Sequence, residues 1–207
     1  MIHRNRIFFG IIFLVLTAFN NAIAGPFEDG QTAFRNNDYA KALQIWQVLA
    51  DRGLIRAQDA IAFMYLKGFG VPQDYAQAIL WYRRAASQGS ASAQNFLGLQ
   101  YDQGQGVPED AKEAVKWYSR AAEQGHPNAQ FNLATMYAQG RGVPKDLVEA
   151  HKWTNLAASR ENNENFRTRY ARDRDYLARR MTVEQLAEAQ RRAREWKPKV
   201  DSNAASK

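Results

Sequence analysis

Apolar residues recur along most of the chain at spacings of three and four, which is the period of an amphipathic helix. In one segment, Ala78, Trp81, Tyr82, Ala85 and Ala86 fall on a single helical face. The pattern returns twice downstream, so the sequence predicts a chain built of helices. Helices of this type, here called B helices, are predicted at Tyr75–Gln88, Ala111–Gln124 and Leu147–Ser159.

These helices belong to an internal repeat with a period of 36 residues. Val71-Pro72-Gln73-Asp74 returns as Val107-Pro108-Glu109-Asp110 and as Val143-Pro144-Lys145-Asp146. Self-similarity at a fixed period of this length is typical of stacked repeat architectures. Other identities in phase are Tyr65, Tyr101 and Tyr137; Trp81, Trp117 and Trp153; and Gly53, Gly89 and Gly125.

Each unit carries a second helix, the A helix, which precedes the B helix. The A helix ends at a glycine, which suits left-handed backbone. A Gly-x-Gly-Val-Pro loop follows, and its proline prevents the helix from continuing. Asp74, Asp110 and Asp146 then stand where the next helix needs an N-cap. A helices are predicted at Arg56–Lys67, Ala91–Gln103 and Asn128–Gln139.

The N-terminus has the pattern of a secretory signal peptide. His3, Arg4 and Arg6 are basic, residues 7–19 are mostly apolar, and Ala22-Ile23-Ala24 matches a small-x-small cleavage signature. The apolar run is shorter than the roughly 20 residues that span a bilayer. We expect cleavage after Ala24 and a periplasmic or secreted protein; a retained N-terminal anchor is the alternative.

Both ends of the repeat array depart from the pattern. Phe27–Arg35 and Asp38–Gly53 resemble a degenerate A and B helix with a short connection. Downstream, a basic helix is predicted at Asn165–Arg180, and a capping box at Thr182 starts a final helix that ends near Trp196. The predicted organisation is a signal peptide (1–24), a solenoid (25–159, with units at about 25–53, 54–89, 90–125 and 126–159), a basic helical cap (160–198) and a disordered tail (199–207).

Composition narrows the function. The chain has no cysteine, which excludes disulfides, Cys-ligated metals, a thiol nucleophile and a lipoprotein anchor. The formal net charge is +7, yet residues 25–159 hold 13 basic and 13 acidic side chains, while residues 160–207 hold 13 and 8. The basic character therefore belongs to the C-terminal quarter. Because the protein is expected to be exported, we expect no nucleic-acid partner, and no stable membrane insertion after cleavage.

Enzyme signatures are weak. After signal cleavage only His126 and His151 remain; His126 lies in an inter-repeat turn, and the phase of His151 predicts an exposed position on the third B helix. The Gly-x-Gly turns lack the third glycine and the preceding strand of a dinucleotide site, and the lysine of a P-loop. We expect no enzyme activity, no catalytic residue, no cofactor and no metal site.

Two stretches, Ala93–Asp110 and Lys116–Gly125, resemble the Sel1-like repeat family, relatives of the tetratricopeptide repeats (TPR). The resemblance covers about Ala33–Ser159 and touches Met181–Gln185. It implies an all-α fold, an α/α superhelical solenoid of Sel1-like/TPR-like helix pairs with C-terminal capping helices. It also implies that the solenoid binds other proteins.

Repeat phase separates scaffold from candidate site. Trp81, Trp117 and Trp153 are identical in all units and are expected to lie between neighbouring helices, and the small residues Ala62, Gly98 and Ala134 indicate close helix contact. Variable positions on the A-helix face away from the B helix are candidates for a partner-binding concave face, as in related solenoids. These candidates are Asp59, Phe63, Lys67, Asn95, Leu99, Gln103, Phe131, Thr135 and Gln139. The alternative is that Phe63 and Phe131 are core residues.

The basic C-terminal segment has two interpretations. Intervening Asp173, Glu188 and Glu195 favour solvated helix faces with i,i+4 pairs, and an apolar side that includes Leu177 favours a cap on the solenoid. The alternative is an anionic-partner site. Its candidate residues are Arg167, Arg174, Arg180, Arg191 and Arg194.

The function expected from these observations is an exported scaffold or adaptor that binds a protein or peptide on its concave A-helix face. Its partner would be an envelope enzyme or sensor that it regulates, or a host protein. The alternative is a cationic binder of an anionic envelope polysaccharide or surface, acting through the C-terminal helices.

Overall fold

The computed structural model describes residues 25–199. The predicted signal peptide and nearly all of the predicted tail lie outside these residues. Within them every regular element is a helix, which confirms the all-α repeat fold. Contacts divide the chain between Ala78 and Ile79, inside α4 (Tyr75–Ser87), into two compact units.

The first unit comprises helical residues 25–35, α2 (Tyr39–Asp51), α3 (Ile55–Lys67) and the start of α4. The short connection before α2 turns at Asn37, whose φ of 62° is left-handed, and the Asp38 side chain caps α2 by accepting from the Lys41 amide. Trp46 packs on Gly30, where a Cβ would lie 2.3 Å from the Trp46 Nε1. That nitrogen donates to the Phe27 carbonyl at 3.3 Å. The N-terminal unit is therefore a helix pair joined by a tight turn.

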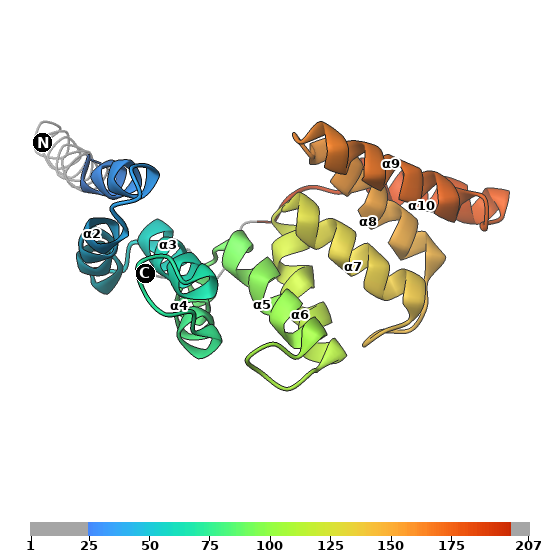
Figure 1. Cartoon of the computed structure of the whole chain (residues 1–207). Helices are drawn as coiled ribbons and strands as arrows, with labels where there is room; N and C mark the ends of the chain where they lie inside the picture. The colour runs from blue at the N-terminus through green and yellow to red at the C-terminus, as the bar shows by residue number, and fades with distance from the viewer. Residues whose placement is uncertain (1–24, 200–207) are drawn as a thin grey trace, which may run out of the picture. The chain divides into compact units, whose positions relative to one another are not determined.

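As far as Lys199, the second unit contains the rest of α4 and six further helices. Consecutive helices pack against one another, α5 on α6, α6 on α7 and α7 on α8 (Figure 1). Their bounds are α5 (Ala91–Gln103), α6 (Ala111–Glu123), α7 (Pro127–Gln139), α8 (Leu147–Arg160), α9 (Glu164–Ala178) and α10 (Val183–Glu195). The predicted helix ends agree with these bounds to within about two residues, which is the usual uncertainty of a helix end.

The predicted caps are confirmed. The side chains of Asp110 and Asp146 accept from the amides of the first turns of α6 and α8, and Asp74 accepts from the Gln77 amide at 3.0 Å. The A helices α3, α5 and α7 each end at a left-handed glycine. Thr182 and Gln185 form the predicted capping box of α10.

A buried glutamine ties each A helix to the helix before it. The amide Nε2 of Gln58, Gln94 and Gln130 donates to a backbone carbonyl eight residues earlier, at 3.1–3.2 Å. Those carbonyls lie near the C-terminal ends of α2, α4 and α6, where helices leave acceptors unsatisfied. Ala-Gln pairs recur at the 36-residue period, at 57–58, 93–94 and 129–130, and this hydrogen bond explains the glutamine in each of them.

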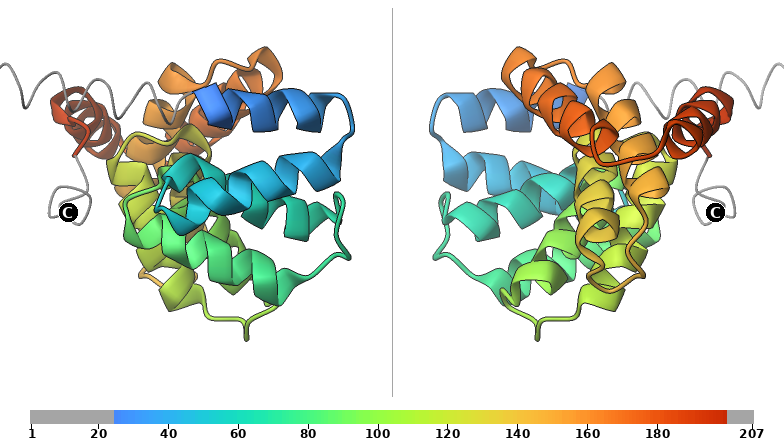
Figure 2. Two further views of the ribbon diagram at one scale, coloured as in Figure 1. Left: turned by 90° about the vertical axis from the view of Figure 1, so that its left-hand side faces the viewer. Right: turned by 90° about the vertical axis from the view of Figure 1, so that its right-hand side faces the viewer.

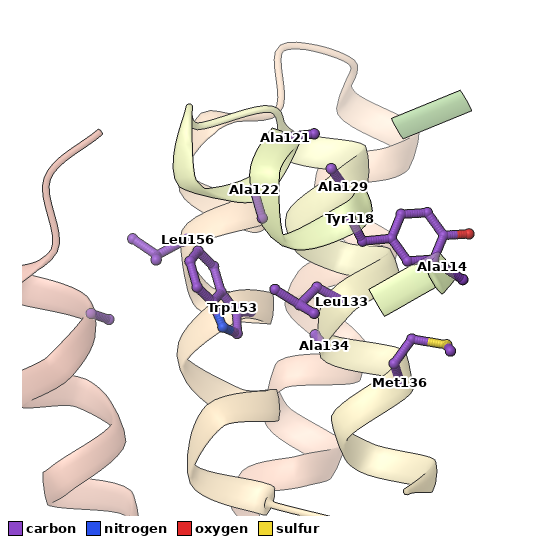
Figure 3. Packing of buried hydrophobic residues seen from close by; sticks show 11 residues of the cluster. Ala114, Tyr118, Ala121, Ala122, Ala129, Leu133, Ala134, Met136, Trp153 and Leu156 are labelled. Carbon is purple, nitrogen blue, oxygen red and sulfur yellow. The ribbon is translucent and has the colours of Figure 1, made fainter. Parts of the chain in front are cut away.

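The core of the second unit lies between α6, α7 and α8. Leu133 of α7 lies among Tyr118 of α6 and Trp153 and Leu156 of α8 (Figure 3). Tyr118 crosses α5 at Gly98, where a Cβ would lie 2.5 Å from its ring. The small residue expected at a close helix contact is therefore required there, because any larger side chain would overlap the ring.

The C-terminal helices α9 and α10 diverge and pack on α8 from different sides (Figure 2). In the first two repeats an arginine three residues after the tryptophan stacks on it, Arg84 on Trp81 at 4.4 Å and Arg120 on Trp117 at 4.8 Å. In the third repeat that position is the buried Leu156. There, Trp196 lies edge-on to Trp153 at 6.1 Å. α10 thus replaces the solvated arginine with an apolar contact.

Two sequence-based expectations need correction. Trp117 is only half-buried, whereas its equivalents Trp81 and Trp153 are buried. His151 is buried, 3% exposed, and was wrongly predicted to face solvent. Its equivalents in the other repeats are the apolar Ile79 and Val115, so the position points inward in every repeat.

Within residues 25–199 no helix combines the length and the apolar character that a membrane crossing requires.

Candidate functional site

The three candidate residues of α3 lie in the first unit beside an aromatic cluster. Phe63 is 39% exposed, with ring centroids 6.4 Å from Phe34 and 5.8 Å from Phe69. Lys67 is exposed and Asp59 is half-buried. Phe63 is therefore neither a core residue nor fully free: one side of its ring packs on its neighbours and the other meets solvent.

The candidates of α5 are less accessible than expected. Asn95 is only 8% exposed, and its Oδ1 accepts from Asn132 Nδ2 of α7 at 3.0 Å. Leu99 is half-buried and packs against the core of the second unit, whereas Gln103 is exposed. Asn95 therefore joins two A helices and is poorly placed to touch a partner.

The three candidates of α7 come together in one place. Phe131, Thr135 and Gln139 line a cavity of about 290 Å³ between α7, α8 and α9, here called the α7–α9 pocket. Its other lining residues are Ala134, Ala138, Leu147, Thr154, Asp173, Tyr176, Leu177 and Arg180. The predicted face of the third A helix is therefore one wall of a pocket whose opposite wall is α9.

Aromatic stacking holds one end of this pocket. The Phe131 ring stacks on Tyr170 of α9 with centroids 4.3 Å apart, and Tyr170 is fixed by a hydrogen bond to Asn128 Oδ1 at 2.7 Å. The Arg169 guanidinium also lies over the Phe131 ring, 5.1 Å from its centroid. Phe131 thus contacts two neighbouring residues of α9 while lining the pocket.

The predicted arginines differ in what they contact. Arg167 pairs with Glu164, and Arg174 donates to Asp175 at 2.7 Å. Arg191 forms ion pairs with both Glu188 and Glu195. These pairs confirm the predicted solvated, charge-paired helix faces. By contrast Arg194 is exposed and, among the described residues, has no ion pair.

Arg180 is held differently, because its partner is an aromatic ring. Its guanidinium lies 5.3 Å from the Tyr176 centroid and donates to the Tyr176 hydroxyl at 3.0 Å. Tyr176 is itself 52% exposed. Arg180 therefore lines the pocket while keeping donors free for another group.

Sequence reasoning missed Arg169, Asp173 and Tyr176. Together with Arg180 they are spaced four, three and four residues apart, so they share one face of α9. That spacing is visible in the sequence. The sequence does not show that this face of α9 lies opposite α7 across a pocket, because only folding brings the two helices together.

The two described histidines have structural roles. His126 is the N-cap of α7, with Nδ1 accepting from the Ala129 amide at 3.3 Å. Burial lowers its pKa below the usual 6.5. Burial also lowers the pKa of His151, and Arg174 acts in the same direction. Both are therefore favoured as neutral groups. Residues 25–199 contain no cluster of three His, Cys, Asp or Glu side chains able to hold a metal.

We expect acid to destabilise the protein through these histidines. Because the folded-state pKa values lie below 6.5, this contribution to stability is complete above about pH 6.5 and is lost as the pH falls through the folded-state values. Each unit of pKa difference corresponds to about 1.4 kcal/mol. Urea unfolding between about pH 7.5 and pH 5 measures the loss, and His151→Val, which installs the residue found at Val115, should reduce it. An identical pH dependence in the variant would contradict the role of His151.

Comparisons with known proteins agree with this geometry. A model of the Sel1 repeat matches residues 55–90, 91–126 and 127–162, in phase with the helix pairs. A Sel1 repeat protein from Oxalobacter formigenes is 35% identical, with a TM-score of 0.62 over 65% of this chain and 55% of that one. The protein c5321, a protective antigen present in uropathogenic Escherichia coli strains displaying an SLR fold, is 29% identical, with a TM-score of 0.69 over 80% of this chain and 35% of that one.

The chain thus spans 55% and 35% of the lengths of these two relatives. No curated protein matched it. Because the three matched repeats cover more than half of the sequence and coincide with the helix pairs of the structure, the chain belongs to the Sel1 repeat family.

Proposed function

We propose that this chain is an exported scaffold that binds a protein or peptide partner through its A-helix faces. Sel1 repeats generally mediate protein–protein interaction. The observation that carries the proposal here is the α7–α9 pocket, which gathers the three variable residues of α7 into one accessible cavity. Recognition of one particular partner needs side chains that differ from repeat to repeat on a constant scaffold.

Export is proposed from the N-terminal pattern of a basic region, an apolar run and Ala22-Ile23-Ala24. The similar protein of uropathogenic Escherichia coli is described as a protective antigen, and an antigen is recognised by the host immune system. That description supports a periplasmic or secreted location. The partner would then be an envelope enzyme or sensor, or a host protein.

The test is affinity capture from an envelope extract with the chain Gly25–Lys207, washed at low and then at raised salt. We expect one defined protein to remain at raised salt, because apolar contacts are not screened as exposed charges are. Fractionation with an antibody to the chain tests export separately. Failure to retain any protein would overturn the scaffold proposal, and a cytoplasmic chain with an uncut N-terminus would overturn export.

A second candidate is binding of an anionic envelope polysaccharide through the C-terminal helices. It is favoured by a groove of about 420 Å³ between α8 and α9, whose lining includes Arg167, Arg174, Asn155 and Thr168. Both arginines already pair with acids, which weakens their attraction for a further anion. In the same capture experiment this candidate predicts an anionic polymer that elutes as salt is raised.

A further inference from the structure

The geometry points to a specific occupant of the α7–α9 pocket: we propose that it takes one large apolar side chain from an acidic segment of the protein partner. This inference rests on the protein-binding function proposed above and adds to it the chemistry of the partner. It is carried by the size of the pocket, by its mainly apolar lining, and by two arginines that no carboxylate of the described residues neutralises.

The pocket has the size of a side-chain site. Its volume is about 290 Å³, at the lower edge of the roughly 300–1,000 Å³ of small-molecule sites. A closed apolar cavity of about 150 Å³ accepts benzene. The pocket therefore has room for one aromatic or branched aliphatic side chain and part of its backbone, which favours a peptide anchor over a cofactor.

The lining of the pocket is mainly apolar, with polar side chains beside it. Ala134, Ala138, Leu147 and Leu177 supply apolar surface, and the hydroxyl of the buried Thr154 is bonded to the Ala150 carbonyl. Thr135 and Gln139 lie on the α7 side, and Gln139 is exposed. An apolar anchor surrounded by polar contacts is the usual arrangement of an interface hot spot.

Within residues 25–199, ion pairs do not cancel the positive charge beside the pocket. Among the residues that the structure describes, no ion pair reaches Arg169 or Arg180. Each is instead held on an aromatic ring that lines the pocket, Arg169 on Phe131 and Arg180 on Tyr176. Stacking on a ring leaves a guanidinium its charge and most of its donors.

Arg169 and Arg180 differ from other arginines of the C-terminal segment in lying on aromatic rings that line the pocket. Arg167, Arg174 and Arg191 all bind carboxylates of their own helices. Asp173, the acid between Arg169 and Tyr176 on the pocket face, forms no ion pair among the described residues and leaves the two cations in excess. Carboxylates on either side of the anchoring residue would therefore meet Arg169 and Arg180.

The test uses a phage-displayed library of random dodecapeptides panned on the chain Gly25–Lys207. We expect enrichment of peptides with a large apolar residue flanked by Asp or Glu. Two variants probe the pocket: Ala138→Leu, which fills it from a half-buried position, and the double substitution Arg169→Gln/Arg180→Gln. The matched control is Arg172→Gln/Arg194→Gln, which removes the same charge from exposed arginines outside the pocket.

Selected peptides should bind the Arg169→Gln/Arg180→Gln variant about tenfold more weakly and the control within about twofold, because two exposed ion pairs are together worth about one decade of affinity. Ala138→Leu should also weaken binding about tenfold, because the added side chain takes up space that the anchoring side chain needs. Thermal unfolding of each variant establishes that it is folded. Peptides that lack acidic residues, or that bind both pocket variants unchanged, would overturn the inference while leaving the scaffold function intact. A library without any binder would also overturn it, whereas the scaffold function itself is judged by the capture experiment.

Discussion

Replacing Trp153 with Ala is expected to lower the free energy of unfolding by about 3–5 kcal/mol, which is the usual loss for a buried tryptophan. Trp153 is 5% exposed and packs against Leu133 and Leu156 and, from α10, Ala193. Its removal leaves a cavity that three helices share. Urea denaturation followed by circular dichroism measures the loss.

The matched control is Trp117→Ala at the same position of the preceding repeat. Trp117 is half-buried and Arg120 stacks on its ring, so we expect a loss of only about 1–2 kcal/mol. In a repeat protein each loss falls on one unit and its neighbours. Equal losses for the two tryptophans would show that α10 does not contribute to burying Trp153.

Gly142→Ala is expected to cost about 3 kcal/mol or more, because two penalties add. The backbone at Gly142 is left-handed, with φ of 68°, which costs other residues about 1–2 kcal/mol. A Cβ there would also lie 2.2 Å from the carbonyl oxygen of Ala111 at the start of α6. Backbone cannot move aside as a flexible side chain can, so the loop and α6 would separate.

Gly104→Ala separates the two penalties. Gly104 has φ of 67° and its nearest neighbour to an added Cβ is 3.4 Å away, so only the conformational cost of about 1–2 kcal/mol is expected. Unfolding midpoints of the two variants give the comparison. A Gly142 variant as stable as the Gly104 variant would mean that the close approach between the loop and α6 is unimportant.

Local chemistry explains why so much of the fold was predictable from the sequence. A 36-residue period repeated three times places glycine at each left-handed helix end and aspartate at each N-cap. Each of these residues acts on the backbone within a few positions of it in the chain. The predicted helix bounds therefore agree closely with the structure. The buried Gln94 and Gln130 are identical between units in the sequence, but their hydrogen bonds to the preceding helix were not predicted.

The candidate site was predictable only in part. The helical period alone predicts that one face of α7 carries Phe131, Thr135 and Gln139. That the same face forms a pocket with Tyr176 and Arg180 depends on the angle at which α9 returns onto α8, and no pattern within α9 encodes that angle.

The amino-acid sequence alone determined the helices, their caps, the repeat and the family, because each of these depends on interactions between residues close in the chain or on a period that can be counted. Tertiary structure alone decided that Asn95 and His151 are buried, that Trp153 is covered while Trp117 is not, and that Arg169 and Arg180 stand on aromatic rings instead of acids. The physical reason is that burial and ion pairing depend on which helix covers a residue, and in a repeat array the outermost units are covered by segments that do not repeat.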